Sequence, residues 1–110
     1  PARYENVLAV SAIDVRLRPS RLSSRGAHIS FAAPGVGLVV AAPRSSHRRV
    51  DGTSFAAPFV TAALAMSLGG KGSGAEAVGR LRAQAKDLGA PGHDPIFGWG
   101  LIQFEAPKGC

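Results

Sequence analysis

The apolar pattern of this chain changes its period near Ser54, and that change limits the folds that the sequence can adopt. Before Ser54, short runs of consecutive apolar residues alternate with polar stretches, as in strands of a sheet that is covered on both faces. After Ser54, apolar residues recur every three or four positions, which predicts buried helices. Strands followed by helices in this way indicate the back half of an α/β layer structure.

The expected strands are short apolar runs that polar or Pro residues end. They are residues 7–13, 29–33 and 36–41. The polar stretch 44–51 is expected to form a loop, and residues 99–104 are a candidate for a short final strand. A sheet with so few strands has an open edge where further strands should lie, so the pattern indicates an incomplete domain.

Two helices are expected after the change of period. The first should run from Ser54 to about Leu68, where glycine stops it. The second should begin at a capping box of Ser73 and Glu76, in which each side chain satisfies a free backbone donor, and should end at Gly89.

The charge of the chain raises the alternative of a small basic module that binds nucleic acid. The chain has 13 Lys and Arg residues against 7 Asp and Glu residues, which gives a net charge of +6. However, aromatic residues make up only 6% and none lies among the arginines, whereas binding of single strands needs stacking surfaces beside the charge. We therefore expect no nucleic-acid partner, and no membrane partner either, because no apolar run is long enough to span a bilayer.

The segment 51–58 contains the main chemical signal. A serine becomes a nucleophile when the fold exposes it, places a base beside it and supplies donors for the oxyanion. Gly52 lets substrate approach the backbone closely, and Thr53 is expected to cap the following helix. Ser54 would then open the helix, with its oxygen and its free amide at the positive end of the helix dipole. The alternative for this segment is an ordinary cap of a buried helix.

The run Gly52-Thr53-Ser54-Phe55-Ala56-Ala57-Pro58 resembles the signature around the catalytic serine of the subtilisin-like serine proteases, the subtilases. Three further segments are similar to stretches of that family, in the same order. They are residues 4–14, residues 23–35 with Ala33-Pro34-Gly35 at their end, and residues 92–102 with the turn Gly98-Trp99-Gly100. The likeness covers nearly the whole chain.

This resemblance implies an α/β fold in which residues 1–110 are the C-terminal portion of one three-layer catalytic domain, with a mainly parallel sheet between helices. It implies that Ser54 is the nucleophile and that its amide is one oxyanion donor, with Gly52 and Thr53 shaping the same hole. The substrate would be a polypeptide, cleaved through an acyl-enzyme. Since such subtilases are usually exported, a secreted or periplasmic protein is expected.

The family places its catalytic Asp and His, and the Asn of its oxyanion hole, upstream of the part that this chain resembles. We therefore expect a missing N-terminal part of the domain to supply them and the 110-residue chain alone to be inactive. His28, His47 and His93 are local alternatives; a pair of His47 with Ser54 is geometrically conceivable, but the family does not use it. A non-catalytic remnant or one half of a split enzyme stays open as an alternative.

No cofactor or metal site is evident in the sequence. Many subtilases bind calcium, but the acidic residues Asp51, Asp87 and Asp94 are isolated and form no carboxylate cluster. The single cysteine, Cys110, excludes an internal disulfide and a metal site made of cysteines alone.

Overall fold

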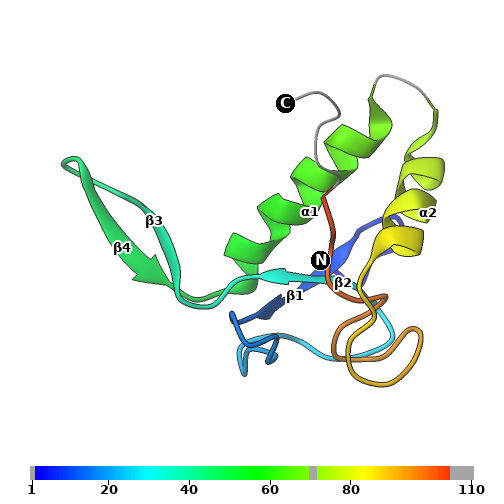
Figure 1. Ribbon diagram of the computed structural model, residues 1–110, viewed down its shortest axis with the longest axis horizontal. Coiled ribbons are helices and arrows are strands. Elements are labelled where there is room, and N and C mark those ends of the chain that lie inside the picture. The colour runs from blue at the N-terminus through cyan, green and yellow to red at the C-terminus, as the bar shows by residue number, and fades with distance from the viewer. Residues whose placement is uncertain (1, 70–71, 105–110) are drawn as a thin grey trace.

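Four strands are followed by two helices in the computed structural model, which describes residues 2–69 and 72–104 (Figure 1). Cys110 lies outside the described residues. The elements are β1 (Ala9–Ile13), β2 (Ile29–Pro34), β3 (Leu38–Ala42), β4 (Ser46–Val50), α1 (Thr53–Leu68) and α2 (Gly74–Gln84). The expected order of strands first and helices second is confirmed.

Strands β1 and β2 form a parallel pair, as near-continuous apolar runs predict. Its register runs from Ala9 opposite Ile29 to Ile13 opposite Pro34. On the other side of β2, Leu101 makes one parallel bridge to Ala32. The candidate final strand at 99–104 is therefore reduced, within the described chain, to the pairing of Leu101, which also bridges Lys86.

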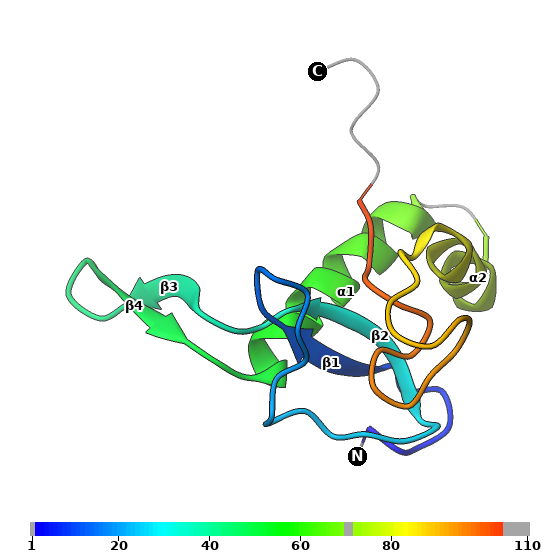
Figure 2. The same cartoon turned by 60° about the horizontal axis from the view of Figure 1, so that its bottom comes forward.

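The two faces of this sheet are covered by different parts of the chain. Helix α1 lies across one face (Figure 2), where Phe31 of β2 is fully buried against it together with Leu81 of α2. On the other face, Ile13 and Ala32 pack against Phe97 of the closing loop. Burying a side chain the size of Phe31 contributes about 2–3 kcal/mol to folding, so these contacts fix α1 against the sheet.

The prediction of a loop at 44–51 is wrong, because residues Ser46–Val50 form β4. Strand β4 pairs antiparallel with β3 in a separate two-stranded sheet, so β3 is also not part of the parallel sheet. This hairpin projects away from the rest of the molecule (Figure 1). Polar residues can form β4 because one side of the strand pairs with β3 while its side chains stay in solvent.

The expected start and end of α1 are nearly right, but its cap is not. Gly52 occupies the N-cap position, no side chain caps the helix, and Thr53 is the first helical residue. The interpretation of Thr53 as a capping residue is therefore wrong. At the other end Gly69 adopts the left-handed conformation that glycine favours and stops the helix after Leu68.

Helix α2 begins at the predicted capping box, in which Ser73 Oγ accepts from the Glu76 amide at 3.2 Å. The predicted end at Gly89 is wrong, because the helix stops at Gln84. Ala85 has left the helical conformation, with ψ at 139°, and the next residue, Lys86, pairs with Leu101 of the closing segment. This tertiary pairing ends the helix before its glycine.

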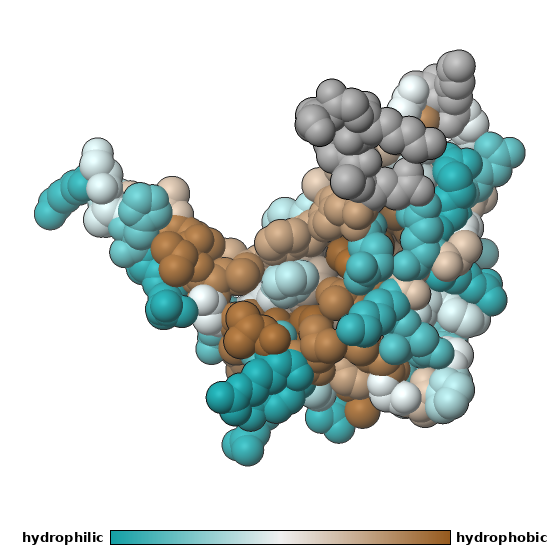
Figure 3. Space-filling view, viewed as in Figure 1, coloured by the Kyte–Doolittle hydropathy of each residue, from teal (hydrophilic) through white to brown (hydrophobic). Residues whose placement is uncertain are grey.

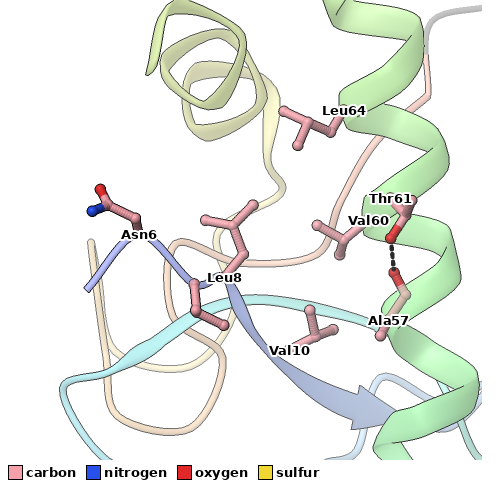
Figure 4. Close-up of a pocket in the computed structure, with 8 residues that line it drawn as sticks. Asn6, Leu8, Val10, Ala57, Val60, Thr61 and Leu64 are labelled. Atoms are coloured by element: carbon pink, nitrogen blue, oxygen red, sulfur yellow. Dashed lines mark hydrogen bonds between the residues drawn. The ribbon is translucent and has the colours of Figure 1, made fainter. Parts of the chain in front are cut away.

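An apolar hollow of about 320 Å³ lies between the start of β1 and α1 (Figure 4). Leu8 and Val10 face Val60 and Leu64 across it, and Asn6 stands at its rim. Large apolar side chains also reach solvent elsewhere, and Figure 3 shows hydrophobic groups at the surface of both the hairpin and the body. No helix of the described residues has the length and hydropathy needed to cross a bilayer.

Candidate active site

Ser54 is the second residue of α1 and is exposed at the start of that helix. The chain reaches it from the carboxyl ends of the parallel strands. The amide of Gly35, just after β2, donates to the Ile13 carbonyl at 3.0 Å, and the Gly52 amide donates to the Gly35 carbonyl at 2.8 Å. Ser54 therefore stands at the edge where parallel α/β sheets place their ligand sites.

Gly35 allows the serine loop to lie directly on the sheet. A Cβ on this residue would lie 2.5 Å from the Ala12 Cβ, 2.8 Å from the Gly52 carbonyl oxygen and 3.0 Å from the Ala56 Cβ. These contacts are closer than carbon and oxygen atoms tolerate, so a side chain here would push α1 away from β1. The small residues Gly35, Ala12 and Ala56 thus let the loop before Ser54 pack directly against the sheet.

Two hydrogen bonds close the base of the β3–β4 hairpin, directly before the serine loop. Asp51 Oδ1 accepts from the Gly37 amide at 2.7 Å, and Arg49 Nη1 donates to the Gly37 carbonyl at 3.1 Å. Sequence reasoning missed both contacts and treated Asp51 as isolated. In the sequence, only the position of Asp51 next to Gly52 pointed to a role for this residue. Its hydrogen-bond partner lies 14 positions earlier, so the sequence around Asp51 does not predict the contact.

The amide and hydroxyl of Ser54 are both available to a ligand. Within the part of the chain that the structure describes, no group makes a hydrogen bond to the hydroxyl. The amide belongs to the first turn, where an α-helix offers no acceptor. The first turn of α1 has no acidic residue, so its dipole favours an anion at this end. Gly52 and Thr53 adjoin Ser54 in the same turn.

The structure does not bring a histidine to Ser54 among the described residues. His47 lies exposed in β4, opposite Ala41. His93 is engaged elsewhere: its Nε2 lies 2.7 Å from the Ile29 carbonyl oxygen, and its ring meets Trp99 edge-on at 5.0 Å between centroids. The described part of the site therefore offers an exposed serine hydroxyl and a free amide, with no histidine beside them.

The three aspartates considered for calcium serve three separate loops. Asp51 binds the Gly37 amide, Asp87 Oδ2 accepts from the Gly92 amide at 2.7 Å, and Asp94 Oδ1 accepts from two amides of its own turn. Residues 2–69 and 72–104 contain no group of three side chains suited to a metal ion. These carboxylates therefore do not fit a calcium site within the described chain.

Comparison with known proteins gives one consistent result. Residues 1–100 match the Subtilase family. The chain is 35% identical over 108 residues to Subtilisin DY of Bacillus licheniformis, covering 96% of this chain and 38% of that protein. It is 34% identical over 110 residues to Minor extracellular protease Epr of Bacillus subtilis, covering 96% of this chain and 17% of that protein.

A solved structure of a lanthipeptide protease has a similar fold, with a TM-score of 0.83 at 26% sequence identity. The similarity covers 93% of this chain and 40% of that one. The chain thus spans less than half of the relatives it matches, and it is a partial α/β domain of their kind. The family match, the relatives and the shared fold agree with the serine motif, and the chain belongs to the subtilase family.

Proposed function

We propose that this protein is a serine endopeptidase that hydrolyses peptide bonds of polypeptide substrates through an acyl-enzyme on Ser54. Residues 1–110 would act as the C-terminal portion of a longer catalytic domain. The observation that carries this proposal is the exposed Ser54 at the open N-terminus of α1, at the carboxyl edge of the sheet, in a chain of the subtilase family.

In this proposal each described group would have one role. Ser54 Oγ would attack the carbonyl carbon of the scissile bond while its proton passes to a base. The charge that develops on the carbonyl oxygen would be stabilised by the Ser54 amide, and Gly52 and Thr53 would shape the same hole. The amine then leaves with the proton, and water hydrolyses the ester. This acyl transfer needs no cofactor.

The base and the second oxyanion donor would come from the upstream part of the domain, as the family arrangement implies. Two features of the described chain support such a docked part. Beyond β2, strand β1 is paired in the described chain only at its end, where Ile13 bridges Pro19, and the apolar hollow beside Leu8 and Val60 lies next to its start. Further strands placed against β1 would cover both features.

Secretion, or export to a periplasm, is the localisation that we propose. The relative named as a minor extracellular protease supports it, because 96% of this chain aligns with that protein. Detection of the mature protein in the culture medium or the periplasmic fraction would test this part of the proposal, and confinement to the cytosol would contradict it.

The central test uses the full-length protein and a fluorophosphonate probe, which reacts with activated serine hydroxyls. We expect labelling of the peptide that contains Ser54 and hydrolysis of casein. Ser54→Ala should abolish labelling and reduce hydrolysis at least about 10³-fold, because a triad loses most of its effect with one member. Ser24→Ala, an exposed serine in the loop before β2, is the matched control.

Two outcomes would overturn the proposal. Hydrolysis that survives Ser54→Ala would assign the reaction to another group. A folded full-length protein that neither labels at Ser54 nor hydrolyses casein would instead be a non-catalytic member of the family.

A further inference from the structure

The β3–β4 hairpin lies in the chain directly between the end of the parallel sheet and the serine. It begins after Gly35, which is bonded to β1, and returns through Val50 to Asp51 and α1. Its base is fixed by the hydrogen bonds of Gly37 to Asp51 and Arg49, described above. The hairpin is therefore held in place relative to Ser54, although it projects from the body (Figure 1).

The charge of this hairpin has one sign. Its ionisable residues are Arg44, His47, Arg48 and Arg49, and all of them are exposed. Arg49 donates to the Gly37 carbonyl, whereas Arg44 and Arg48 make no hydrogen bond or ion pair within the described ranges. Two guanidinium groups are thus free to bind a carboxylate, which their planar shape suits.

On each face of the hairpin, a valine of β3 lies opposite an arginine of β4. Val40 pairs with Arg48 on one face, and Val39 pairs with Arg49 on the other. Val39 is 60% exposed, so its apolar side chain is available for a contact with another chain. A peptide lying along this surface would meet an apolar contact and a positive charge together.

The hairpin is within reach of a substrate bound at Ser54. Arg48 is six residues from Ser54 along the chain and Arg44 is ten, so their Cα atoms lie at most about 22 Å and about 36 Å from that of Ser54. An extended peptide advances about 3.3 Å per residue. A peptide that runs from Ser54 along the hairpin would therefore pass Arg48 within about seven residues of the scissile bond and Arg44 within about eleven.

We propose that the β3–β4 hairpin is a substrate-contacting element that selects polypeptides with acidic side chains at a distance from the cleaved bond, through Arg48 in β4 and Arg44 in the turn of the hairpin. This inference rests on the proposed function, since it needs cleavage at Ser54. It assigns the positive charge of the hairpin to substrate selection rather than to the binding of nucleic acid.

The test uses the full-length protein and pairs of peptides that differ only by Glu or Gln at one position, scanned along both sides of the cleaved bond. At one or more positions we expect kcat/KM to be about fivefold higher for Glu, because exposed ion pairs contribute little individually. The double variant Arg44→Gln/Arg48→Gln should bring this ratio close to one, mainly by lowering kcat/KM for the Glu peptide. Salt should also reduce the ratio.

Arg3→Gln is the matched control, because Arg3 is an exposed arginine that precedes β1 in the chain and lies outside the hairpin. It should leave the ratio unchanged. Cleavage without a preference for Glu at any position, or a preference that survives the double variant, would overturn this inference and leave the proposed function intact.

Two other results separate the inference from its alternatives. Absence of both cleavage and Ser54 labelling would overturn the proposed function and this inference with it. Salt-dependent binding of a single-stranded oligonucleotide that the double variant loses, in a protease that shows no preference for Glu, would assign the hairpin to nucleic acid instead.

Discussion

Gly35 and Gly52 lie against each other, with the amide of Gly52 donating to the carbonyl of Gly35 at 2.8 Å. A Cβ on Gly35 would stand 2.8 Å from the Gly52 carbonyl oxygen. This contact joins the end of the parallel sheet to the start of α1. It sets the position of Ser54 relative to the sheet.

Gly35→Ala should destabilise the full-length protein by about 1–3 kcal/mol and reduce kcat, because the added methyl group must displace α1 from β1. Thermal unfolding and hydrolysis of a peptide substrate measure the two effects. Gly79→Ala in α2 is the control: a methyl group there would meet no atom within 4 Å beyond its own turn of helix, so it should stabilise the helix by up to about 1 kcal/mol. Equal effects of both substitutions would contradict the role given to Gly35.

Ser11→Ala should stabilise the protein by up to about 1 kcal/mol. Ser11 in β1 is completely buried, and its hydroxyl has no hydrogen-bond partner within the described chain. Ser30→Ala is the comparison, since Ser30 Oγ accepts from the Ala9 amide at 3.3 Å and its loss should destabilise by about 1 kcal/mol. Chemical denaturation of the full-length protein gives both values. Destabilisation by Ser11→Ala would show that the upstream part provides a partner.

Asp94→Ala should cost about 2–4 kcal/mol of stability. Asp94 is 4% exposed, and its Oδ1 accepts from the amides of Ile96 at 2.7 Å and Phe97 at 2.9 Å, both of which would lose their acceptor. Asp94→Asn keeps an acceptor oxygen and should cost clearly less. If the two variants unfold at the same denaturant concentration, the carboxylate does not hold this turn.

The carboxyl of Asp14 should titrate below its ordinary range. The backbone amide of Arg18 is the largest cause of this lowered pKa, and the Arg18 side chain and the Arg16 amide add to it against partial desolvation. Because the pKa of Asp14 is lower in the folded state, the ionised carboxylate stabilises the fold. This contribution is complete above the usual carboxyl pKa of about 3.9 and is lost as the pH falls through the lower folded pKa.

NMR titration of the Asp14 carboxyl carbon in the full-length protein measures this pKa. Arg18→Gln removes the side-chain hydrogen bond and the charge but keeps the backbone amide, so the pKa of Asp14 should rise in that variant relative to the parent protein. A midpoint at or above that of an unfolded peptide would contradict the loop geometry around Asp14.

The purified 110-residue chain should not hydrolyse peptides, because its described residues place no base beside Ser54. Peptide turnover by this chain, measured with and without Ser54→Ala, checks the expectation. Robust turnover that the substitution removes would show that a local residue serves as the base.

Sequence patterns predict the elements whose side chains are buried and miss those that depend on distant partners. The apolar runs of β1 and β2 and the three- to four-residue spacing of α1 identify the layers correctly, since burial dictates these patterns. Strand β4 escapes prediction because its residues are polar and it exists through pairing with β3. The end of α2 is misplaced because Lys86 pairs with Leu101 from a remote part of the chain.

The sequence motif identifies Ser54 as the candidate residue, but the sequence does not predict the contacts that position it. Gly35 and Asp51 each act on a residue far away in sequence, and neither a glycine nor an aspartate in a loop predicts its partner. Threonine suits the role of a cap, which is why Thr53 is assigned to it, but Gly52 occupies the position and leaves the first turn without a side-chain acceptor.

The bridge between Leu101 and Ala32 has a consequence for biosynthesis. The ribosome synthesises β2 before the closing segment, so one edge of this strand stays unpaired while α1 and α2 are being translated. A nascent chain that stalls before Trp99 would expose that unpaired edge of β2 to other nascent chains. Translation through the closing segment is therefore the step that ends this period of vulnerability to aggregation.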